Sequence, residues 1–378
     1  MRTIGILGAG QLAQMTCLAG RELGFVMHVF ANHALEPAAL VADRVCVGSL
    51  RDLGRLKEFA QTVSVVTYDT ELLPIESVRW VSQYTRAAPD PQVLFTAQNR
   101  ERERLFLIEQ GIETPRVAFI HSERQLAEAV SRVGVPAVLK TLEQGYDGKG
   151  QALVRRVADM ADAWRALGSV PCVLEEWLES PLEMSVIVAR GENGDMRSYP
   201  VIDNEHRRHI LHRSVSPSAL PDDVQRQAVA IAERIAVALS LTGLLTVEMF
   251  YASDGRVLVN ELAPRPHNSG HHTQLSAATS QFEQLVRAVS GLPLGDTKHR
   301  PAAMINLLGD AFANTDDQSY RRQGFVYPDR PAGNVYFYGK SEARSGRKMG
   351  HLIALADTAA EAAKEADEWY EKFMNARR

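Results

Sequence analysis

The amino-terminal segment constrains the fold most, because an apolar strand runs directly into a glycine turn and then into a helix. The strand is expected at residues 3–7, and Gly8-Ala9-Gly10-Gln11-Leu12-Ala13 follows it. Such a turn places free backbone N–H groups at a helix amino terminus, where an anion can bind. A further apolar strand at 63–68, with helical stretches between, predicts an open parallel α/β domain over residues 1–98.

The same segment disfavours a nicotinamide-dependent dehydrogenase. The turn is close to the GxGxxG/A fingerprint, but a dehydrogenase also needs an acidic residue roughly 20 residues further on to bind a ribose. After the second apolar stretch this chain has Ala31 and Asn32 instead. A dehydrogenase therefore stays a third alternative, which failure to bind a nicotinamide cofactor would remove.

Length, charge and cysteine content limit the class of protein. The 378 residues suggest two or three domains with ample mass for a core. A net charge of −4 gives no electrostatic reason to expect nucleic acid or an anionic membrane as a partner. Cys17, Cys46 and Cys172 form no CxxC pair, which fits a reducing compartment, and no segment approaches the roughly 20 apolar residues that span a bilayer. We expect a cytoplasmic protein.

A run of alternating charges, Arg100-Glu101-Arg102-Glu103-Arg104, follows Pro89 and Pro91 and marks the start of a second domain. Runs of this kind are usually the solvated face of a helix. We therefore expect a helix whose charged side chains are exposed.

A β-hairpin with two glutamates on one face is expected around a turn at 252–255. With Tyr251 paired to Arg256, Glu248 lies diagonal to Glu261, at roughly 7–8 Å between Cα atoms. Apolar neighbours favour burial of both carboxylates, which would then repel each other. Because Mg²⁺ prefers one or two carboxylates together with substrate phosphates, the pair predicts a magnesium site. The alternative is two glutamates on a solvated face.

The polar run directly after the hairpin, at 264–268, has no packing rationale, and it places an arginine, a histidine and an asparagine in a turn-forming segment. A segment of this composition is suited to a ligand. It strengthens the interpretation of the neighbouring glutamates as a metal site.

Two glycine-containing segments carry cations suited to phosphate. An apolar strand ends at Lys140, and the glycine-rich loop 145–151 follows, whose backbone N–H groups can approach a phosphate closely. Near the carboxyl end, Tyr338-Gly339-Lys340 and residues 344–351 form two basic arms suited to a phosphomonoester. The alternatives are an ordinary flexible turn and a solvated basic loop.

The strand expected at 172–178 opens into a polar linker, with Glu183 shortly after it. A hinge of this type can present backbone groups to a purine edge and a carboxylate to a ribose. An ordinary edge strand is the alternative, and the sequence alone does not separate the two.

Taken together, a lysine at a strand end, a glycine-rich loop, a hinge glutamate and a glutamate hairpin resemble the ATP-grasp ligases. Four motifs are similar to those of the 5-(carboxyamino)imidazole ribonucleotide synthases, bicarbonate-using enzymes of microbial purine synthesis: GILGAGQLAQM at 5–15, GYDGKGQ at 145–151, NELAPRPHNSGHHT at 260–273 and GRKMGH at 346–351. The resemblance implies an α/β and α+β protein, usually a homodimer. The implied domains are a Rossmann-like preATP-grasp domain (1–98), an ATP-grasp domain (99–297) with a mobile lid at about 118–178, and a small carboxyl-terminal domain (298–378).

The resemblance also implies the site residues. Those that would bind ATP are Arg100, Lys140, Gly145, Tyr146, Asp147, Gly148, Lys149, Gly150, Gln151, Glu175, Glu176, Trp177, Leu178, Glu183, His206, Asn260 and Glu261. The catalytic residues would be Asp147, Lys149, Arg265, His267, Asn268 and Lys340, of which Arg265, His267 and Asn268 would surround bicarbonate and carboxyphosphate. Those that would bind 5-aminoimidazole ribonucleotide are Gln11, Glu71, Tyr146, Asp147, Lys340 and Arg347. The Mg²⁺ ligands would be Glu248 and Glu261.

The chain departs from the family pattern at two places. Leu142-Glu143-Gln144 stands before the glycine-rich loop, where basic and glycine residues are common, so lid mobility and ATP affinity are expected to differ. The segment 68–73 replaces a Tyr-Glu-Phe-Glu-Asn pattern, which bears on the role of Glu71. In addition, strand alternation turns Asn260 away from Glu261 unless the strand ends there.

The implied reaction fits the chemistry of these residues. Transfer of the γ-phosphoryl group from ATP converts bicarbonate into carboxyphosphate, whose charge lysines and Mg²⁺ can neutralise. Loss of phosphate then leaves CO₂ beside the exocyclic amine, with Asp147 as the expected base. Two alternatives stay open: another ATP-grasp ligase, such as a formate-dependent glycinamide ribonucleotide transformylase, and a nucleotide-binding regulator without turnover.

Overall fold

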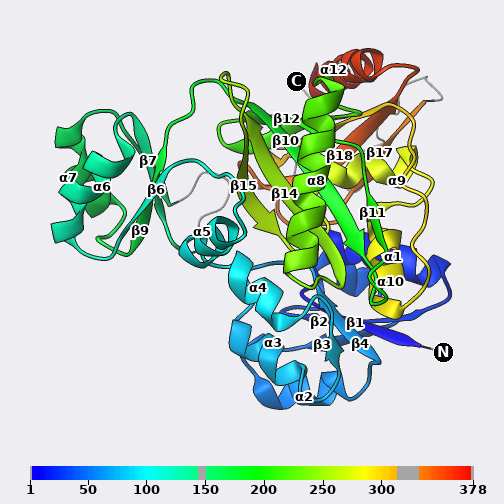
Figure 1. Ribbon diagram of the computed structural model, residues 1–378. Coiled ribbons are helices and arrows are strands. Elements are labelled where there is room, and N and C mark those ends of the chain that lie inside the picture. The colour runs from blue at the N-terminus through cyan, green and yellow to red at the C-terminus, as the bar shows by residue number, and fades with distance from the viewer. Residues whose placement is uncertain (1, 144–149, 313–331, 376–378) are drawn as a thin grey trace.

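The computed structural model describes residues 2–143, 150–312 and 332–375 (Figure 1). Three sheets organise these residues: a five-stranded parallel sheet, a four-stranded antiparallel sheet and a nine-stranded antiparallel sheet. This combination confirms the expected α/β and α+β architecture. Among the described helices, none combines the length and apolar character needed to cross a lipid bilayer.

The first domain is the predicted parallel α/β unit, with strand order β3-β2-β1-β4-β5. Its strands are β1 (Thr3–Leu7), β2 (Val26–Ala31), β3 (Arg44–Val47), β4 (Val65–Tyr68) and β5 (Arg86–Ala87). Its helices are α1 (Gln11–Glu22), α2 (Leu53–Ala60), α3 (Ile75–Val81) and α4 (Pro91–Ala97). In this open parallel sheet, ligands are expected at the carboxyl ends of the strands.

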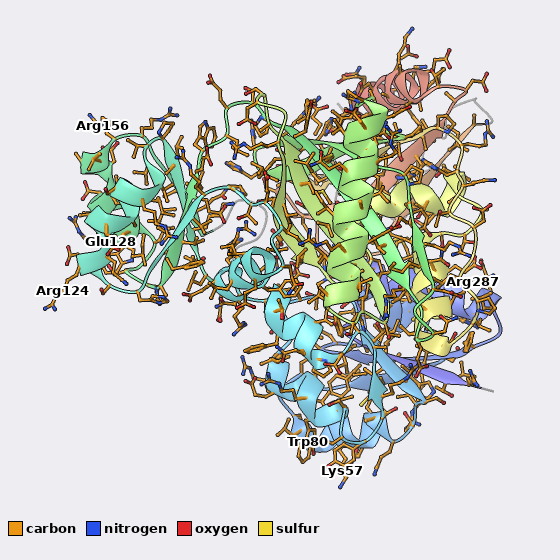
Figure 2. The ribbon with its side chains drawn as sticks, viewed as in Figure 1. Lys57, Trp80, Arg124, Glu128, Arg156 and Arg287 are labelled. Carbon is orange, nitrogen blue, oxygen red and sulfur yellow. The ribbon has the colours of Figure 1, made fainter. Side chains whose placement is uncertain are left out.

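The four-stranded sheet forms a small unit that projects away from the rest of the molecule (Figure 1). Its elements are β6 (Val117–Ile120), α6 (Leu126–Val133), β7 (Ala137–Thr141), β8 (Gln151–Val154), α7 (Met160–Ala166) and β9 (Cys172–Glu176). The charged side chains of Arg124, Glu128 and Arg156 point outward from it (Figure 2). The unit covers most of the range predicted for the lid.

The nine-stranded sheet crosses the predicted boundary between the second and third domains. Its strands are β10 (Leu182–Arg190), β11 (Met196–Ser198), β12 (Ile202–Arg207), β13 (Ile210–Ser216), β14 (Gly243–Tyr251), β15 (Val257–Ala263), β16 (Ala302–Leu308), β17 (Gly333–Phe337) and β18 (Lys348–Leu355). The helices beside it are α5 (Arg100–Glu109), α8 (Asp222–Ala238), α9 (Thr273–Ser276), α10 (Gln281–Ser290) and α12 (Ala359–Asn375). Because β13 pairs with β16, the carboxyl-terminal strands extend the sheet of the predicted second domain.

An apolar core joins the first domain to the nine-stranded sheet. Ile4 and Val29 of the parallel sheet belong to the same buried cluster as Ile187, Leu244 and Leu285. Burial of apolar surface is the main stabilising contribution to such an interface. This packing brings the carboxyl ends of β1 and β4 close to the segment that follows β15.

Candidate active site

A cavity of about 360 Å³ lies where the first domain meets the large sheet. Its wall is built from the glycine turn before α1, the segment after β4, the polar run after β15 and Lys348 at the start of β18. Five of the predicted site residues line it: Gln11, Glu71, Arg265, His267 and Asn268. The fold therefore brings together side chains that come from both ends of the sequence.

The two hairpin glutamates face each other, although in a different register from the predicted one. Tyr251 pairs with Val257 rather than with Arg256, and Glu248 lies directly opposite Glu261 rather than diagonal to it. Two shifts of one residue each cause the difference. At the turn, Ala252 rather than Tyr251 faces Arg256, and a β-bulge between Met249 and Glu248 then adds one residue to β15. The prediction that both carboxylates share one face is confirmed, and the predicted register is wrong.

The bulge decides which side chains reach the site. Met249 and Val259 pair and both belong to the apolar core on one face of the sheet. By alternation, Glu248 lies on the other face, and the extra residue in β15 lets Glu261 join it there. The bulge thus occurs within β15 at Asn260, and the strand continues beyond it. We expected Asn260 to act beside Glu261 only if the strand ended there, and β15 does not end at Asn260.

The carboxylate pair is electrostatically unbalanced. Burial raises the pKa of Glu261, and the charge of Glu248 raises it further. Burial would also raise the pKa of Glu248, but the hydrogen bond from His267 holds this pKa below its ordinary value. One carboxylate is therefore held ionised while its neighbour is disfavoured as an anion. A divalent cation between them would relieve this conflict, so the donor set fits Mg²⁺.

Arg265 and Glu71 form a two-point ion pair across 194 positions of sequence. Arg265 Nη2 lies 2.8 Å from Glu71 Oε1, and its Nε contacts Oε2. Burial would raise the pKa of Glu71, but Arg265 lowers it to about 2, so the carboxylate is ionised at neutral pH. Glu71 thus fixes the orientation of Arg265 in the cavity wall, although the segment 68–73 around Glu71 departs from the family pattern.

His267 connects Glu248 to a neighbouring hydroxyl. Its Nε2 lies 2.8 Å from Glu248 Oε1, and its Nδ1 lies 2.9 Å from Ser269 Oγ. The same Nδ1 accepts the backbone N–H of Ser269 and caps the short helix η4 (Asn268–His272). The imidazole is therefore held on both sides rather than free to rotate.

The glycine turn binds a carboxylate of the protein itself. The Gly10 N–H donates to Asp69 Oδ2 at 2.8 Å. A Cβ on Gly8 would lie 1.9 Å from Asp69 Oδ1, and the φ of +95° at Gly8 also requires glycine. Burial raises the pKa of Asp69 to about 6. Part of the anion-binding capacity that we predicted for this turn is therefore used internally.

Two residues of the charged run on α5 are buried, against the expectation of a solvated helix face. Glu103 is 2% exposed and Arg104 is 1% exposed. Arg104 contacts both Glu103 and Glu175 at 3.0 Å, and it donates to the Asn260 carbonyl at 2.6 Å. Glu103 accepts the backbone N–H of Leu262 at 2.6 Å. The physical reason is that this face of α5 packs against β15, where the ions neutralise each other and satisfy backbone groups.

Lys140 joins the same buried cluster from the end of β7. Its Nζ lies 2.5 Å from Glu175 Oε2. Burial would raise the pKa of Glu175, but Arg104 and Lys140 lower it to about 2. Because the Glu175 side chain is held by these two cations, an adenine ring at this hinge would meet the backbone of the strand rather than this carboxylate.

The remaining predicted nucleotide residues lie around this hinge. Glu176 contacts the Arg116 guanidinium at 3.2 Å, and Trp177 is 44% exposed. Glu183 and His206 lie on the paired strands β10 and β12, and Glu183 Oε2 lies 2.5 Å from His206 Nδ1. The structure therefore brings together the two residues predicted near the ribose.

The glycine-rich loop is only partly described. Gly145, Tyr146, Asp147, Gly148 and Lys149 lie outside the described residues. At the end of the loop, the Gly150 carbonyl accepts the backbone N–H of Thr141, and Gln151 Nε2 lies 3.2 Å from His209 Nδ1. Arg100 donates to the Thr141 carbonyl at 2.8 Å, which places it beside the base of this loop.

The basic arms near the carboxyl end meet at β18. Lys340 Nζ donates to the Lys348 carbonyl at 2.7 Å, and Arg347 donates to the Glu342 carbonyl at 2.8 Å. Lys348 itself lines the cavity. The arms therefore reach the cavity wall through a residue that we had not selected.

Asn268 forms a reciprocal amide pair. Its Nδ2 donates to Asn306 Oδ1 at 3.0 Å, and Asn306 Nδ2 donates to Asn268 Oδ1 at 2.7 Å. Asn306 also donates to the Leu211 carbonyl at 2.8 Å. The pair ties the polar run after β15 to β16, so Asn268 has a structural contact in addition to its place in the cavity wall.

Four charged or amide side chains of the cavity wall were not predicted as site residues: Asn32, Glu36, Asp69 and Lys348. Asn32 and Asp69 directly follow β2 and β4, so their position at the carboxyl ends of parallel strands was an available signal. Lys348 lies within the GRKMGH motif that we noted at 346–351, although we did not select it as a site residue. Glu36 carried no signal of this kind.

Comparison with known proteins agrees with this geometry. Residues 1–98 match a ribonucleotide synthetase preATP-grasp domain, residues 105–282 an ATP-grasp domain, and residues 302–365 a phosphoribosylaminoimidazole carboxylase C-terminal domain. Fold and site therefore define an ATP-grasp enzyme.

Relatives narrow the assignment. The N5-carboxyaminoimidazole ribonucleotide synthase of Bacillus subtilis is 36% identical over 373 residues, which cover 98% of this chain and 94% of the relative. That of Pseudomonas aeruginosa is 37% identical, with coverage of 96% and 98%. The protein belongs to the N5-carboxyaminoimidazole ribonucleotide synthase family.

Solved structures give the same result. The ADP complex of an N5-carboxyaminoimidazole ribonucleotide synthetase has a TM-score of 0.91 at 36% identity, covering 100% of this chain and 97% of the other. An Aspergillus clavatus synthase in complex with ADP and 5-aminoimidazole ribonucleotide has a TM-score of 0.89 at 26% identity, with 99% of both chains covered.

Proposed function

We propose that this protein carboxylates the exocyclic amine of 5-aminoimidazole ribonucleotide with ATP and bicarbonate. The products are N5-carboxyaminoimidazole ribonucleotide, ADP and phosphate, in de novo purine biosynthesis. The observation that carries the proposal is the facing pair Glu248 and Glu261, which His267 connects to the cavity between the first domain and the ATP-grasp sheet. Similarity to the synthases along the whole chain supports it.

Glu248 and Glu261 would hold Mg²⁺, because a buried, mutually repelling carboxylate pair is suited to a hard cation. When bound, the ion supplies neutralisation of charge on the ATP phosphate oxygens. Lys140 and the loop 145–151 would bind the phosphates, with Arg100 at the base of the loop. Residues 175–178 would line the adenine, and Glu183 would bind the ribose beside His206. The Asn260 backbone belongs to the same region.

The reaction begins when a bicarbonate oxygen attacks the γ-phosphorus. The bond from phosphorus to the bridging oxygen of ADP breaks, ADP leaves, and carboxyphosphate forms. Arg265 provides a guanidinium that Glu71 already orients, so little reorganisation is needed to stabilise the new anion. His267 and Asn268 complete this side of the cavity.

Carboxyphosphate then releases phosphate and CO₂, and the exocyclic nitrogen forms the new bond to carbon. Asp147 is proposed as the base that takes the proton from this nitrogen, with Lys149 beside it in the lid loop. Closure of the lid would keep water away from carboxyphosphate, which otherwise hydrolyses.

Binding of the acceptor nucleotide is proposed in the same cavity. Gln11, Glu71 and Tyr146 would contact the aminoimidazole ring. Lys340 and Arg347 would bind the 5′-phosphate, and Lys348 is added to them because it lines the cavity. A homodimer in the cytoplasm is also predicted.

Oxygen labelling tests this route. If bicarbonate attacks the γ-phosphorus, one bicarbonate oxygen remains on phosphorus when CO₂ leaves. Turnover with 18O-labelled bicarbonate should therefore give inorganic phosphate that carries one labelled oxygen, measured by mass spectrometry. Phosphate without label would show that water attacks ATP directly, and the carboxyphosphate route would be abandoned.

A further inference from the structure

A row of polar side chains crosses adjacent strands of the nine-stranded sheet behind His267. Ser185 on β10 lies opposite Glu248 on β14, and Asn204 on β12 lies opposite Ser214 on β13. Ser185, Ser214 and the overlying Ser269 are fully buried. Buried polar groups need hydrogen-bond partners, and these side chains supply them to one another.

The contacts form one unbroken chain of five hydrogen bonds that ends at the carboxylate. Within the sheet, Ser214 Oγ lies 2.8 Å from Asn204 Oδ1, and Asn204 Nδ2 lies 3.0 Å from Ser185 Oγ. Ser185 Oγ lies 2.8 Å from Ser269 Oγ, which lies 2.9 Å from His267 Nδ1. The last contact is 2.8 Å, from His267 Nε2 to Glu248 Oε1. The chain thus links a residue three strands away to a proposed metal ligand.

One backbone group shows the direction in which the whole chain runs. The Ser269 N–H points at His267 Nδ1, 3.3 Å away, and a backbone amide can only donate. His267 Nδ1 is therefore an acceptor, and the imidazole hydrogen is on Nε2, where it donates to Glu248. The Ser269 hydroxyl then donates to Nδ1 and accepts from Ser185. The Ser185 oxygen in turn accepts from the Asn204 amide, so every hydrogen in the chain points toward Glu248.

We propose that Ser269, Ser185 and Asn204 are positioning residues that hold His267 in the tautomer with hydrogen on Nε2, so that His267 fixes the orientation of the Glu248 carboxylate. Partners of this kind orient the groups that contact a metal, and their loss typically costs about 10- to 100-fold in metal affinity or activity. The effect on catalysis rests on the proposed function of Glu248, whereas the tautomer of His267 does not.

The substitution Asn204→Asp reverses the chain without changing the size of the side chain. An ionised carboxylate only accepts, so the Ser185 hydroxyl must turn toward it and the Ser269 hydroxyl must turn toward Ser185. The Ser269 oxygen then presents a lone pair to His267 Nδ1. We expect a hydrogen on Nδ1 in a large fraction of the molecules, and kcat lowered by about 10- to 100-fold with little change in the KM for 5-aminoimidazole ribonucleotide.

The tautomer is measured by 15N NMR on histidine-labelled protein without substrates, with the His267 signals assigned from a His267→Gln variant. The wild-type protein should show hydrogen on Nε2 and a bare Nδ1, and Asn204→Asp should move hydrogen to Nδ1. Ser216→Ala is the matched control, because this buried serine on β13 is bonded to His299 instead and should leave the His267 spectrum unchanged.

A second background shows whether the effect travels along the chain. In Ser185→Ala the connection to Asn204 is removed, so adding Asn204→Asp should leave His267 with the wild-type tautomer. Hydrogen on Nδ1 in the wild-type protein, or an equal shift with and without Ser185, would overturn the proposal. Because these spectra need no turnover, failure of the proposed reaction would leave them unaffected.

Discussion

Replacement of Glu261 or Glu248 by glutamine is expected to lower turnover by about 10²- to 10⁴-fold, the effect of losing several kcal/mol of charge stabilisation in the transition state. The two carboxylates face each other across the hairpin, so each variant removes one of two proposed Mg²⁺ ligands. Steady-state kcat at saturating ATP, bicarbonate and acceptor measures the effect.

Stability separates this result from a folding defect. Burial and the charge of Glu248 both disfavour the Glu261 anion, so a neutral amide at position 261 relieves repulsion. The melting temperature of Glu261→Gln without metal should equal or exceed that of the wild-type protein. Asp254→Asn is the matched control, because this exposed carboxylate lies at the turn of the same hairpin and, within the described residues, forms an ion pair with Arg256 alone. Near-normal turnover in both glutamate variants would return the pair to an ordinary structural role.

Replacement of Arg104 by methionine is expected to lower the free energy of unfolding by about 3–5 kcal/mol. The guanidinium is 1% exposed and contacts both Glu103 and Glu175, which are equally inaccessible. Without it, Glu103 loses the cation that it contacts, whereas Glu175 keeps its contact with Lys140. Removing one partner of a buried ion cluster costs more than the net stabilisation of the cluster, because the other charge stays buried.

Arg102→Met on the same helix provides the comparison. The Arg102 guanidinium lies 3.8 Å from the centre of the Phe95 ring near the surface, a contact that contributes about 0.5–1 kcal/mol. Chemical denaturation of both variants measures the difference. Equal destabilisation of the two would show that the buried cluster contributes no more than a surface contact.

The parts of the fold that depend on local patterns could be predicted from the sequence. At the amino terminus, apolar residues repeat every two positions in the strand and every 3.6 positions in the helix. Such patterns depend only on residues that are close in sequence. The hairpin of Glu248 and Glu261 was predicted for the same reason. Its register could not be, because the turn places Ala252 opposite Arg256 and an extra residue in β15 shifts the pairs beyond Met249, whereas alternation rules assume a regular hairpin.

Contacts between distant segments lay beyond such patterns. The ion pair of Glu71 with Arg265 joins residues from different domains, and the sequence around each residue contains no sign of the other. The charged run on α5 was misjudged because charge alone favours solvent, whereas packing against β15 buries Glu103 and Arg104. The resemblance to a family found Arg265 without explaining what holds it.

The rate of ADP formation, measured with and without 5-aminoimidazole ribonucleotide and bicarbonate, tests the central claim most directly. The lid should close productively only over a complete set of substrates, because closure assembles the phosphate and acceptor sites together. The account predicts slow ATP hydrolysis by the enzyme alone and strong stimulation when both substrates are present. Equal rates with and without them, or stimulation by formate and glycinamide ribonucleotide instead, would contradict it.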